Sequence, residues 1–207
     1  MKYEWKKNEK NYYLPKNKPE LIKIPLFNFF AIEGKGNPNE EFFAEYVSVL
    51  YSLAYAVRMS SKSGAAPKGY FEYTVYPLEG IWDISEAAKK NFNGVFDKSS
   101  LVFNLMIKQP DFVTEKYALE IIDKTKNKKP SKLLDKVKFI KLEEGSCVQM
   151  MHIGSYDSET ESFKLMEEFC AENKLIRASK THREIYLSDP RKVSPDKLKT
   201  VLRFRIK

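Results

Sequence analysis

A short segment near the C-terminus combines an imidazole, a carboxylate and a phenol at alternating positions. It spans residues 181–190 and contains His182, Glu184 and Tyr186. Such side chains can move protons, because a carboxylate accepts or holds a proton and a phenol donates a hydrogen bond. The alternation predicts a strand that sends all three to one face and Ile185 to the other. We expect helices to cover the aliphatic face, so the polar face is either exposed surface or the wall of a cleft.

Two environments are therefore open for Glu184. On exposed surface it would be solvated or would form an ion pair with Arg183 or Lys180. In a cleft walled by aromatic rings, the carboxylate would lose solvation and could hold or accept a proton near neutral pH. The surrounding elements decide which of the two environments applies.

Other catalytic groups are scarce. The chain has two histidines, His152 and His182, and two cysteines, Cys147 and Cys170. None of them has the spacing of a zinc site, and no Ser-His-Asp or Cys-His arrangement is visible. We therefore expect no metal or organic cofactor. The few cysteines and the lack of an apolar N-terminal segment favour a cytoplasmic protein with reduced thiols.

Aromatic residues are abundant and suggest a ligand surface. The 207-residue chain is 43% hydrophobic and 14% aromatic, with 12 Tyr and 14 Phe. Any single ring is more often part of a core, but the excess is typical of a flat apolar surface that stacks on ligands.

The net charge of +8 does not by itself predict a nucleic-acid partner. The densest lysine run, residues 124–132, is interpreted as a solvated helix end and linker rather than a nucleic-acid patch, because no DNA- or RNA-binding motif accompanies it. No apolar run is long enough for a transmembrane helix, so no membrane partner is expected.

The apolar periodicity predicts an α+β fold built from a tandem repeat. Each half has the order strand, helix, strand, strand, and a repeat of this length is a fold-level signal. We expect pseudo-twofold symmetry, with helices on one side of the sheets and a ligand cleft on the concave side. In the first half we expect strands at 21–36, 69–84 and 100–108, a helix at 39–59 and a turn at Asn93-Gly94. A helix at 112–127, capped by Asp111, follows. In the second half we expect strands at 139–154, 176–188 and 199–206, and a helix that is capped by Asp157 or Ser158.

The predicted domain organisation follows these elements. Residues 1–20 form an irregular arm whose aromatic side chains pack on the body, and residues 21–207 form one domain. Within that domain the first repeat covers about 21–110, a linking helix covers 111–128, and the second repeat covers about 136–207.

Three motifs carry a resemblance to a known family. They are Ile32-Glu33-Gly34 after the first strand, the segment 73–82 (YTVYPLEGIW), and the segment 182–190 (HREIYLSDP). The chain resembles the GyrI-like small-molecule-binding family, which is related to the effector-binding domains of AraC- and MerR-type regulators. The resemblance covers residues 19–207, and the opening residues 1–7 look like a branch of stand-alone bacterial members.

The resemblance implies a duplicated fold with a ligand cleft between the halves and Glu184 at the cleft floor among aromatics. In the regulators, that glutamate faces cationic planar drugs. In some stand-alone relatives, the activity is hydrolysis of a strained cyclopropane in DNA-alkylating natural products, which protects the cell. This chain lacks the DNA-binding domain of the regulators, which leaves binding or catalysis. Inhibition of gyrase by protein contact rests on the family name alone.

The expected function is therefore hydrolysis of the cyclopropane ring of flat, aromatic alkylating compounds. The alternative is a non-catalytic protein that binds or sequesters such compounds, with Glu184 as counter-charge. The expected partner is a small planar aromatic molecule, and the chain is expected to be a monomer or weak homo-oligomer. Glu184 is the predicted general base and Tyr186 a predicted donor, while the predicted substrate-binding residues are Trp82, Tyr70, Tyr76, Phe30, Met106 and His152.

The predicted aromatic contacts depend on strand register. In the expected strand at 69–84, Tyr70 and Tyr76 share one face and Tyr73 lies on the other. At most two of these tyrosines line a cleft, and a bulge at Pro77 would change which ones do.

Overall fold

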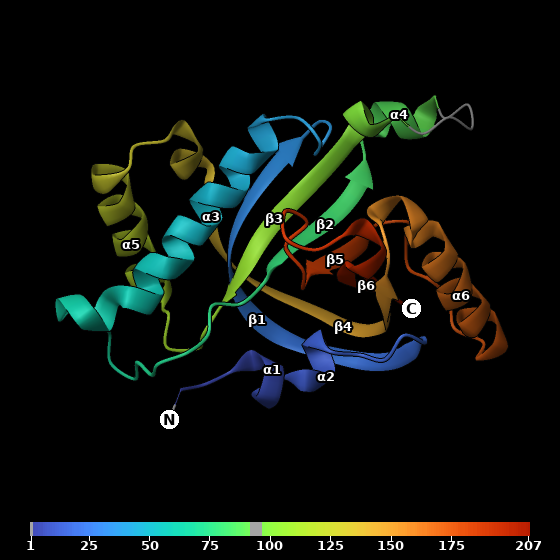
Figure 1. Ribbon diagram of the computed structural model, residues 1–207, viewed down its shortest axis with the longest axis horizontal. Coiled ribbons are helices and arrows are strands. Elements are labelled where there is room, and N and C mark those ends of the chain that lie inside the picture. Colours follow the sequence, from blue (N-terminus) through green and yellow to red (C-terminus); the bar gives the residue numbers. More distant parts are fainter. Residues whose placement is uncertain (1, 92–96) are drawn as a thin grey trace. The chain divides into compact units, whose positions relative to one another are not determined.

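The computed structural model describes residues 2–91 and 97–207, in which β-strands alternate with α-helices (Figure 1). The strands are β1 (Glu20–Lys35), β2 (Leu78–Ile84), β3 (Leu101–Gln109), β4 (Lys138–Ile153), β5 (His182–Tyr186) and β6 (Lys199–Arg205). The helices are α1 (Trp5–Asn8), α2 (Lys10–Tyr13), α3 (Phe42–Met59), α4 (Glu86–Lys90), α5 (Glu115–Lys128) and α6 (Glu159–Glu172). Short 3₁₀ turns occur at Ser60–Ser63, Lys98–Ser100, Lys132–Lys136, Tyr156–Ser158 and Pro195–Lys197. The expected turn at Asn93-Gly94 lies outside the described residues.

The element order confirms the α+β fold class. Apart from the five-residue helix α4 between β2 and β3 and the linking helix α5, the chain runs β1-α3-β2-β3 and then β4-α6-β5-β6, so each half has the order strand, helix, strand, strand. The hydrogen-bonded strand order is β1-β3-β2-β5-β6-β4, and the sheet closes on itself. The repeat read from the sequence therefore corresponds to the order of the elements.

The described chain forms two compact units. Unit 1 comprises residues 2–3, 27–78, 82–91 and 97–142, and unit 2 comprises residues 4–26, 79–81 and 143–207. Strands β1, β2 and β4 contribute residues to both units.

In unit 1, α3 packs on the face of β3 that carries Phe103. The Phe103 ring meets Phe43 and Tyr46 of α3 edge-on, with centroid distances of 5.4 Å for each pair. Strands β1 and β3 are antiparallel, with Gly34 opposite Phe103 and Phe30 opposite Ile107, so Phe30 lies on this same face. The buried residues of α3 recur at spacings of three and four, which gives the apolar stripe of a packed helix: Val49, Leu50, Leu53, Ala54 and Val57.

Two predicted boundaries in unit 1 were wrong. The strand expected at 69–84 begins only at Leu78, because the residues before it pair with backbone at a single bridge, Tyr3 to Tyr73. The alternating aromatic residues of this segment form ring contacts instead of a ladder of strand hydrogen bonds. Phe71 and Tyr73 both pack against Phe112. The cap of α5 is Thr114, whose side chain accepts from a backbone N–H of the first turn, and Asp111 is not the cap.

In unit 2, α6 packs on one face of the antiparallel strands β4, β6 and β5. Leu202 of β6 lies opposite both Met150 of β4 and Glu184 of β5, so these three side chains share a face. Met166 and Cys170 of α6 complete the apolar cluster on that face. Buried methionine, leucine and cysteine side chains thus hold the helix against the sheet.

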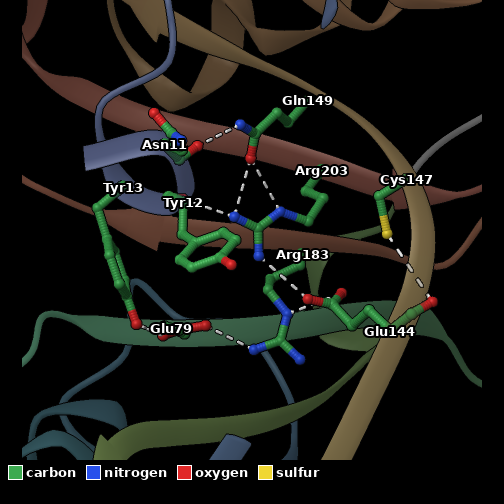
Figure 2. A network of polar contacts seen from close by, with 9 residues as sticks. All are labelled: Asn11, Tyr12, Tyr13, Glu79, Glu144, Cys147, Gln149, Arg183 and Arg203. Atoms are coloured by element: carbon green, nitrogen blue, oxygen red, sulfur yellow. Dashed lines mark hydrogen bonds and ion pairs between the residues drawn. The ribbon is translucent and has the colours of Figure 1, made fainter. Parts of the chain in front are cut away.

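The opposite face of unit 2 carries a buried ionic network (Figure 2). Arg183 Nη1 lies 2.5 Å from Glu79 Oε2, and Arg183 Nε lies 3.0 Å from Glu144 Oε1. Arg203 Nη1 lies 3.1 Å from the second oxygen of Glu144. Two guanidinium groups and two carboxylates compensate one another, which is the condition under which buried charge is tolerated.

The N-terminal residues extend this network. Arg203 Nη2 donates to the carbonyl of Tyr12 over 2.6 Å, and Gln149 donates to the carbonyl of Asn11 over 2.8 Å (Figure 2). The Tyr13 hydroxyl donates to Glu79 over 3.2 Å. The segment expected as an irregular arm therefore contains the short helices α1 and α2, and its residues 4–20 belong to unit 2.

Candidate functional site

Glu184 lies at the centre of a polar cluster on β5. Its Oε2 accepts a hydrogen bond from the Tyr186 hydroxyl at 2.8 Å, and its Oε1 lies 3.0 Å from His182 Nε2. The Glu184 side chain is 12% exposed and the His182 side chain 22%. The period-two alternation placed these three residues on one face, and the register of β5 confirms it.

The expectation that helices cover the aliphatic face of this segment was wrong. Helix α6 lies on the side of Glu184, and its Phe163 ring meets the His182 ring edge-on at 4.7 Å. The other face of β5 carries Ile185 together with Arg183. That face is buried as well, since Arg183 finds its carboxylate partners there. Glu184 is therefore neither plain surface nor on a face free of helices.

The first residue of α6 brings a second carboxyl group to the cluster. Glu159 is only 7% exposed. Burial, then the charges of Glu184 and Asp157, raise the pKa of Glu159 to about 10. The N-terminus of α6 favours an ionised side chain by only about 0.3–1 kcal/mol, whereas each pKa unit corresponds to about 1.36 kcal/mol. Burial therefore outweighs the helix N-terminus and disfavours the ionised form of Glu159.

A second tyrosine, Tyr156, lies next to Tyr186 in this cluster. Tyr156 meets Tyr186 edge-on at a centroid distance of 5.9 Å. Burial, followed by the negative charges of Glu184 and Glu159, raises the pKa of Tyr156 to about 12. The raised pKa keeps the phenol of Tyr156 a hydrogen-bond donor at neutral pH, and the Tyr186 hydroxyl donates to Glu184.

His152 is fixed by internal hydrogen bonds. Its Nε2 lies 3.0 Å from the carbonyl oxygen of Ser155, and its Nδ1 lies 2.9 Å from Ser162 Oγ. A carbonyl can only accept, so the assigned tautomer carries its proton on Nε2 and accepts from Ser162 at Nδ1. His152 lies in the same cross-strand row as Tyr186, through Thr200 of β6. The contacts hold the start of α6, while the predicted ligand contact stays a prediction.

The remaining predicted contact residues belong to unit 1. Trp82 is buried and stacks on Phe43, with ring centroids 6.0 Å apart. Tyr70 is half-buried and donates its hydroxyl to the carbonyl of Arg58 over 2.7 Å. Three further predicted residues are buried in unit 1: Phe30, Tyr76 and Met106. Their roles in ligand binding, and the ligand cleft itself, stay predictions.

The structure therefore brings together Glu184, Tyr186 and two residues that the sequence did not single out, Glu159 and Tyr156. The available signal was weak: Asp157 or Ser158 was expected to cap the helix, which places Glu159 in its first turn. The local sequence pattern does not indicate that the first turn of this helix lies near Glu184. Among the described residues, no group of three or more His, Cys, Asp and Glu side chains is arranged to hold a metal ion.

Comparison with known proteins identifies the family. The model of the GyrI-like small molecule binding domain matches residues 17–207. The chain belongs to this family. Two solved structures of Listeria innocua proteins, each described as a hydrolase, are 36% and 38% identical to this GyrI-like chain, with TM-scores of 0.89 and 0.90. In both cases the match covers all of both chains.

More distant structures share the fold. The C-terminal domain of EcmrR is 11% identical with a TM-score of 0.55, and the match covers 92% of this GyrI-like chain and 97% of that domain. No curated protein matches at a significant level. In the described part of the chain, no helix combines the length and apolar character needed to cross a membrane.

Proposed function

We propose that this GyrI-like protein binds flat aromatic compounds and hydrolyses the cyclopropane ring of cyclopropanoid alkylating agents, with Glu184 as general base. The observation that carries the proposal is the environment of Glu184, a mostly buried carboxylate that accepts from Tyr186 and lies against His182. The hydrolase description of the Listeria innocua relatives supports a catalytic role. Destruction of such an agent would protect the cell.

The proposed step balances without a cofactor. The water oxygen forms a bond to a methylene carbon of the cyclopropane as the bond between that carbon and the dienone ring breaks. The electron pair of the broken bond moves into the ring and onto the carbonyl oxygen, which becomes a phenolate. Glu184 takes the proton that water loses, and the phenolate takes a proton from a donor or from solvent. Aromatisation of the ring supplies the driving force.

The proposal places the attacking water at Glu184. A carboxylate offers about four acceptor positions. The partners Tyr186 and His182 take one position on each oxygen, and the proposal places the attacking water at a remaining one. Because the Tyr186 hydroxyl points to Glu184, its proposed role is to orient that carboxylate, and another donor serves the carbonyl oxygen. The proposal assigns stacking of the flat substrate to Trp82 and the other predicted rings.

The test is Glu184→Gln, which keeps the size of the side chain and removes the base. We expect substrate binding to persist and turnover to fall by about 10²–10⁴-fold, the usual contribution of a general base. Turnover is followed by mass spectrometry as the water adduct of a cyclopropanoid compound, with ¹⁸O-water as label, and binding is followed by calorimetry. The matched control is Glu161→Gln, an exposed glutamate of α6, which should turn over like the wild type. Equal rates for Glu184→Gln and the control would refute the base assignment.

The alternative is a binding protein that sequesters aromatic compounds. It is supported by the membership in a small-molecule-binding family and by the carboxylate of Glu184, which would then act as a counter-charge. The same experiment separates the two functions. Saturable binding without any water adduct, in the wild type and in Glu184→Gln alike, would establish the binding role.

A further inference from the structure

The first residue of β5, His182, lies within hydrogen-bond distance of the Glu184 carboxylate. His182 Nε2 is 3.0 Å from Glu184 Oε1, while the Tyr186 hydroxyl donates to Oε2 over 2.8 Å. The three residues occupy alternating positions of one strand, so their side chains project from the same face. Each oxygen of the carboxylate therefore has a neighbour from its own strand, and all three residues belong to unit 2.

The chemistry of Glu184 determines where the proton of this contact lies. An ionised carboxylate carries no hydrogen, so it can only accept. Beside an ionised Glu184, the 3.0 Å contact is a hydrogen bond only when Nε2 of His182 carries a proton. A general base must be ionised to take a proton from water. The proposed mechanism therefore requires His182 to be the donor of this pair.

The titratable neighbours of Glu184 outside β5 are acidic. Glu159 at the start of α6 is a carboxyl group, and the negative charge of Glu184 contributes to its raised pKa. The charges of Glu184, Glu159 and Asp189 likewise contribute to the raised pKa of Tyr156. These groups do not offset the charge of Glu184, whereas a hydrogen bond from His182 does.

Helix α6 and the segment before β5 hold the His182 ring in place. The ring meets Phe163 of α6 edge-on, with centroids 4.7 Å apart. The guanidinium of Arg177 lies 5.4 Å from the centre of the same Phe163 ring. Arg177 also donates to the carbonyls of Ser179 and Lys180 over 2.8 and 2.9 Å, which orders the segment that leads into β5. These contacts restrict rotation of the imidazole away from the carboxylate, so the donor is pre-organised.

We propose that His182 is a positioning residue for the general base: its Nε2–H fixes Glu184 Oε1, as the Tyr186 hydroxyl fixes Oε2, and so directs a remaining acceptor position of the carboxylate at the attacking water. The role in turnover rests on the proposed function. In the step itself, the proton of water moves to Glu184, and His182 keeps its own proton. A protonated carboxyl group still accepts hydrogen bonds, so the contact with Nε2 persists through the reaction.

The hydrogen bond is tested on the wild-type protein without substrate. Long-range ¹H–¹⁵N correlation spectra of histidine-labelled protein near neutral pH show which ring nitrogens carry protons, and His182→Gln assigns the two histidines of the chain. We expect a protonated Nε2 on His182, with a downfield proton signal that moves upfield or exchanges with water in Glu184→Ala. A His182 ring protonated only on Nδ1, or a signal unchanged in Glu184→Ala, would overturn the proposal.

The positioning role is tested by comparing His182→Gln with His182→Leu. The glutamine amide can place its nitrogen where Nε2 lies, whereas leucine packs on Phe163 without a donor. We expect kcat of His182→Leu to fall about 10–100-fold below wild type, the usual effect of losing a hydrogen bond to a charged group, and kcat of His182→Gln to stay within about threefold of wild type. KM and the calorimetric affinity should be similar in all three proteins, because the contact orients the base rather than the substrate.

The matched control is Lys164→Leu. Lys164 is an exposed residue of α6 next to Phe163 and receives the same new side chain, so this variant should keep the wild-type kcat. Equal kcat in His182→Gln and His182→Leu, or a loss confined to KM, would refute the positioning role. If Glu184→Gln turns over like the wild type, the base assignment fails instead, and the NMR spectra still decide whether His182 holds Glu184.

Discussion

Replacement of Arg183 by methionine should strongly destabilise unit 2. The Arg183 side chain is 2% exposed and contacts Glu79 Oε2 at 2.5 Å and Glu144 Oε1 at 3.0 Å. Methionine fills part of the volume of the arginine side chain but carries no positive charge. Glu144 would retain Arg203, whereas Glu79 would retain the hydroxyl of Tyr13, which is not a counter-charge. Removal of one partner from a buried ion pair costs about 3–5 kcal/mol, because the other charge remains buried.

Urea denaturation can measure this loss with a fluorescent reporter in unit 2. Trp5 is buried in unit 2 and Trp82 in unit 1, so the fluorescence of a Trp82→Phe background reports on unit 2. With a slope of about 1–3 kcal/mol per molar urea, the expected loss lowers the midpoint by about 1–5 M. The control is Arg191→Met, since Arg191 pairs with Asp189 at 2.8 Å but is 85% exposed. Equal midpoints for Arg183→Met and Arg191→Met would refute the reasoning.

A double variant separates buried charge from lost packing. In Glu79→Gln combined with Arg183→Met, the carboxylate left without a counter-charge is gone. We expect the double variant to be more stable than Arg183→Met alone, because replacing a buried pair as a whole is often neutral or stabilising. A double variant less stable than Arg183→Met would show that packing, not charge, dominates.

Two further predictions concern the stability of the protein at low pH and the effect of a side chain at Gly34. Burial alone would raise the pKa of Glu144, but the charges of Arg183 and Arg203 hold it below the ordinary 4.5. The stability from this group is thus present above pH 4.5 and is lost as pH falls through the lowered pKa. The urea concentration at the unfolding midpoint should therefore decrease as the solution is acidified below pH 4.5, and should decrease less in Glu144→Gln. Gly34→Ala should cost about 1–3 kcal/mol in thermal unfolding, because the added Cβ would overlap the Phe103 ring and lie 2.8 Å from Tyr46 Cε1; an unchanged midpoint would contradict it.

The sequence predicted the order of elements well because local periodicity sets it. The apolar stripe of α3 and the alternation in β4 are visible without tertiary information. The boundaries that failed lie where tertiary contacts override a local pattern. Residues 69–77 alternate like a strand, but Tyr73 has one bridge partner and its ring packs on Phe112 and Tyr76.

The candidate site was predictable only in part, for a similar reason. Alternation alone placed Glu184 and Tyr186 on one face. It could not tell which face α6 covers, because a buried arginine such as Arg183 looks like a surface residue until its carboxylate partners are known. One of these partners, Glu79, is 104 residues away in the chain. The proximity of Glu159 to Glu184 has the same origin, since it brings a helix turn to a strand that follows the helix.

The two faces of β5 are linked by register. Arg183 lies opposite Arg203, and Glu184 lies opposite Leu202. A slip of one residue would turn Glu184 toward the ionic network and Arg183 toward α6, since such a slip exchanges the faces of every side chain. Glu184 would then add a third carboxylate to Glu79 and Glu144, while Arg183 would be buried against the apolar surface of Leu202. Both changes are costly, so the network on one face of β5 selects the register that presents Glu184 to α6 on the other.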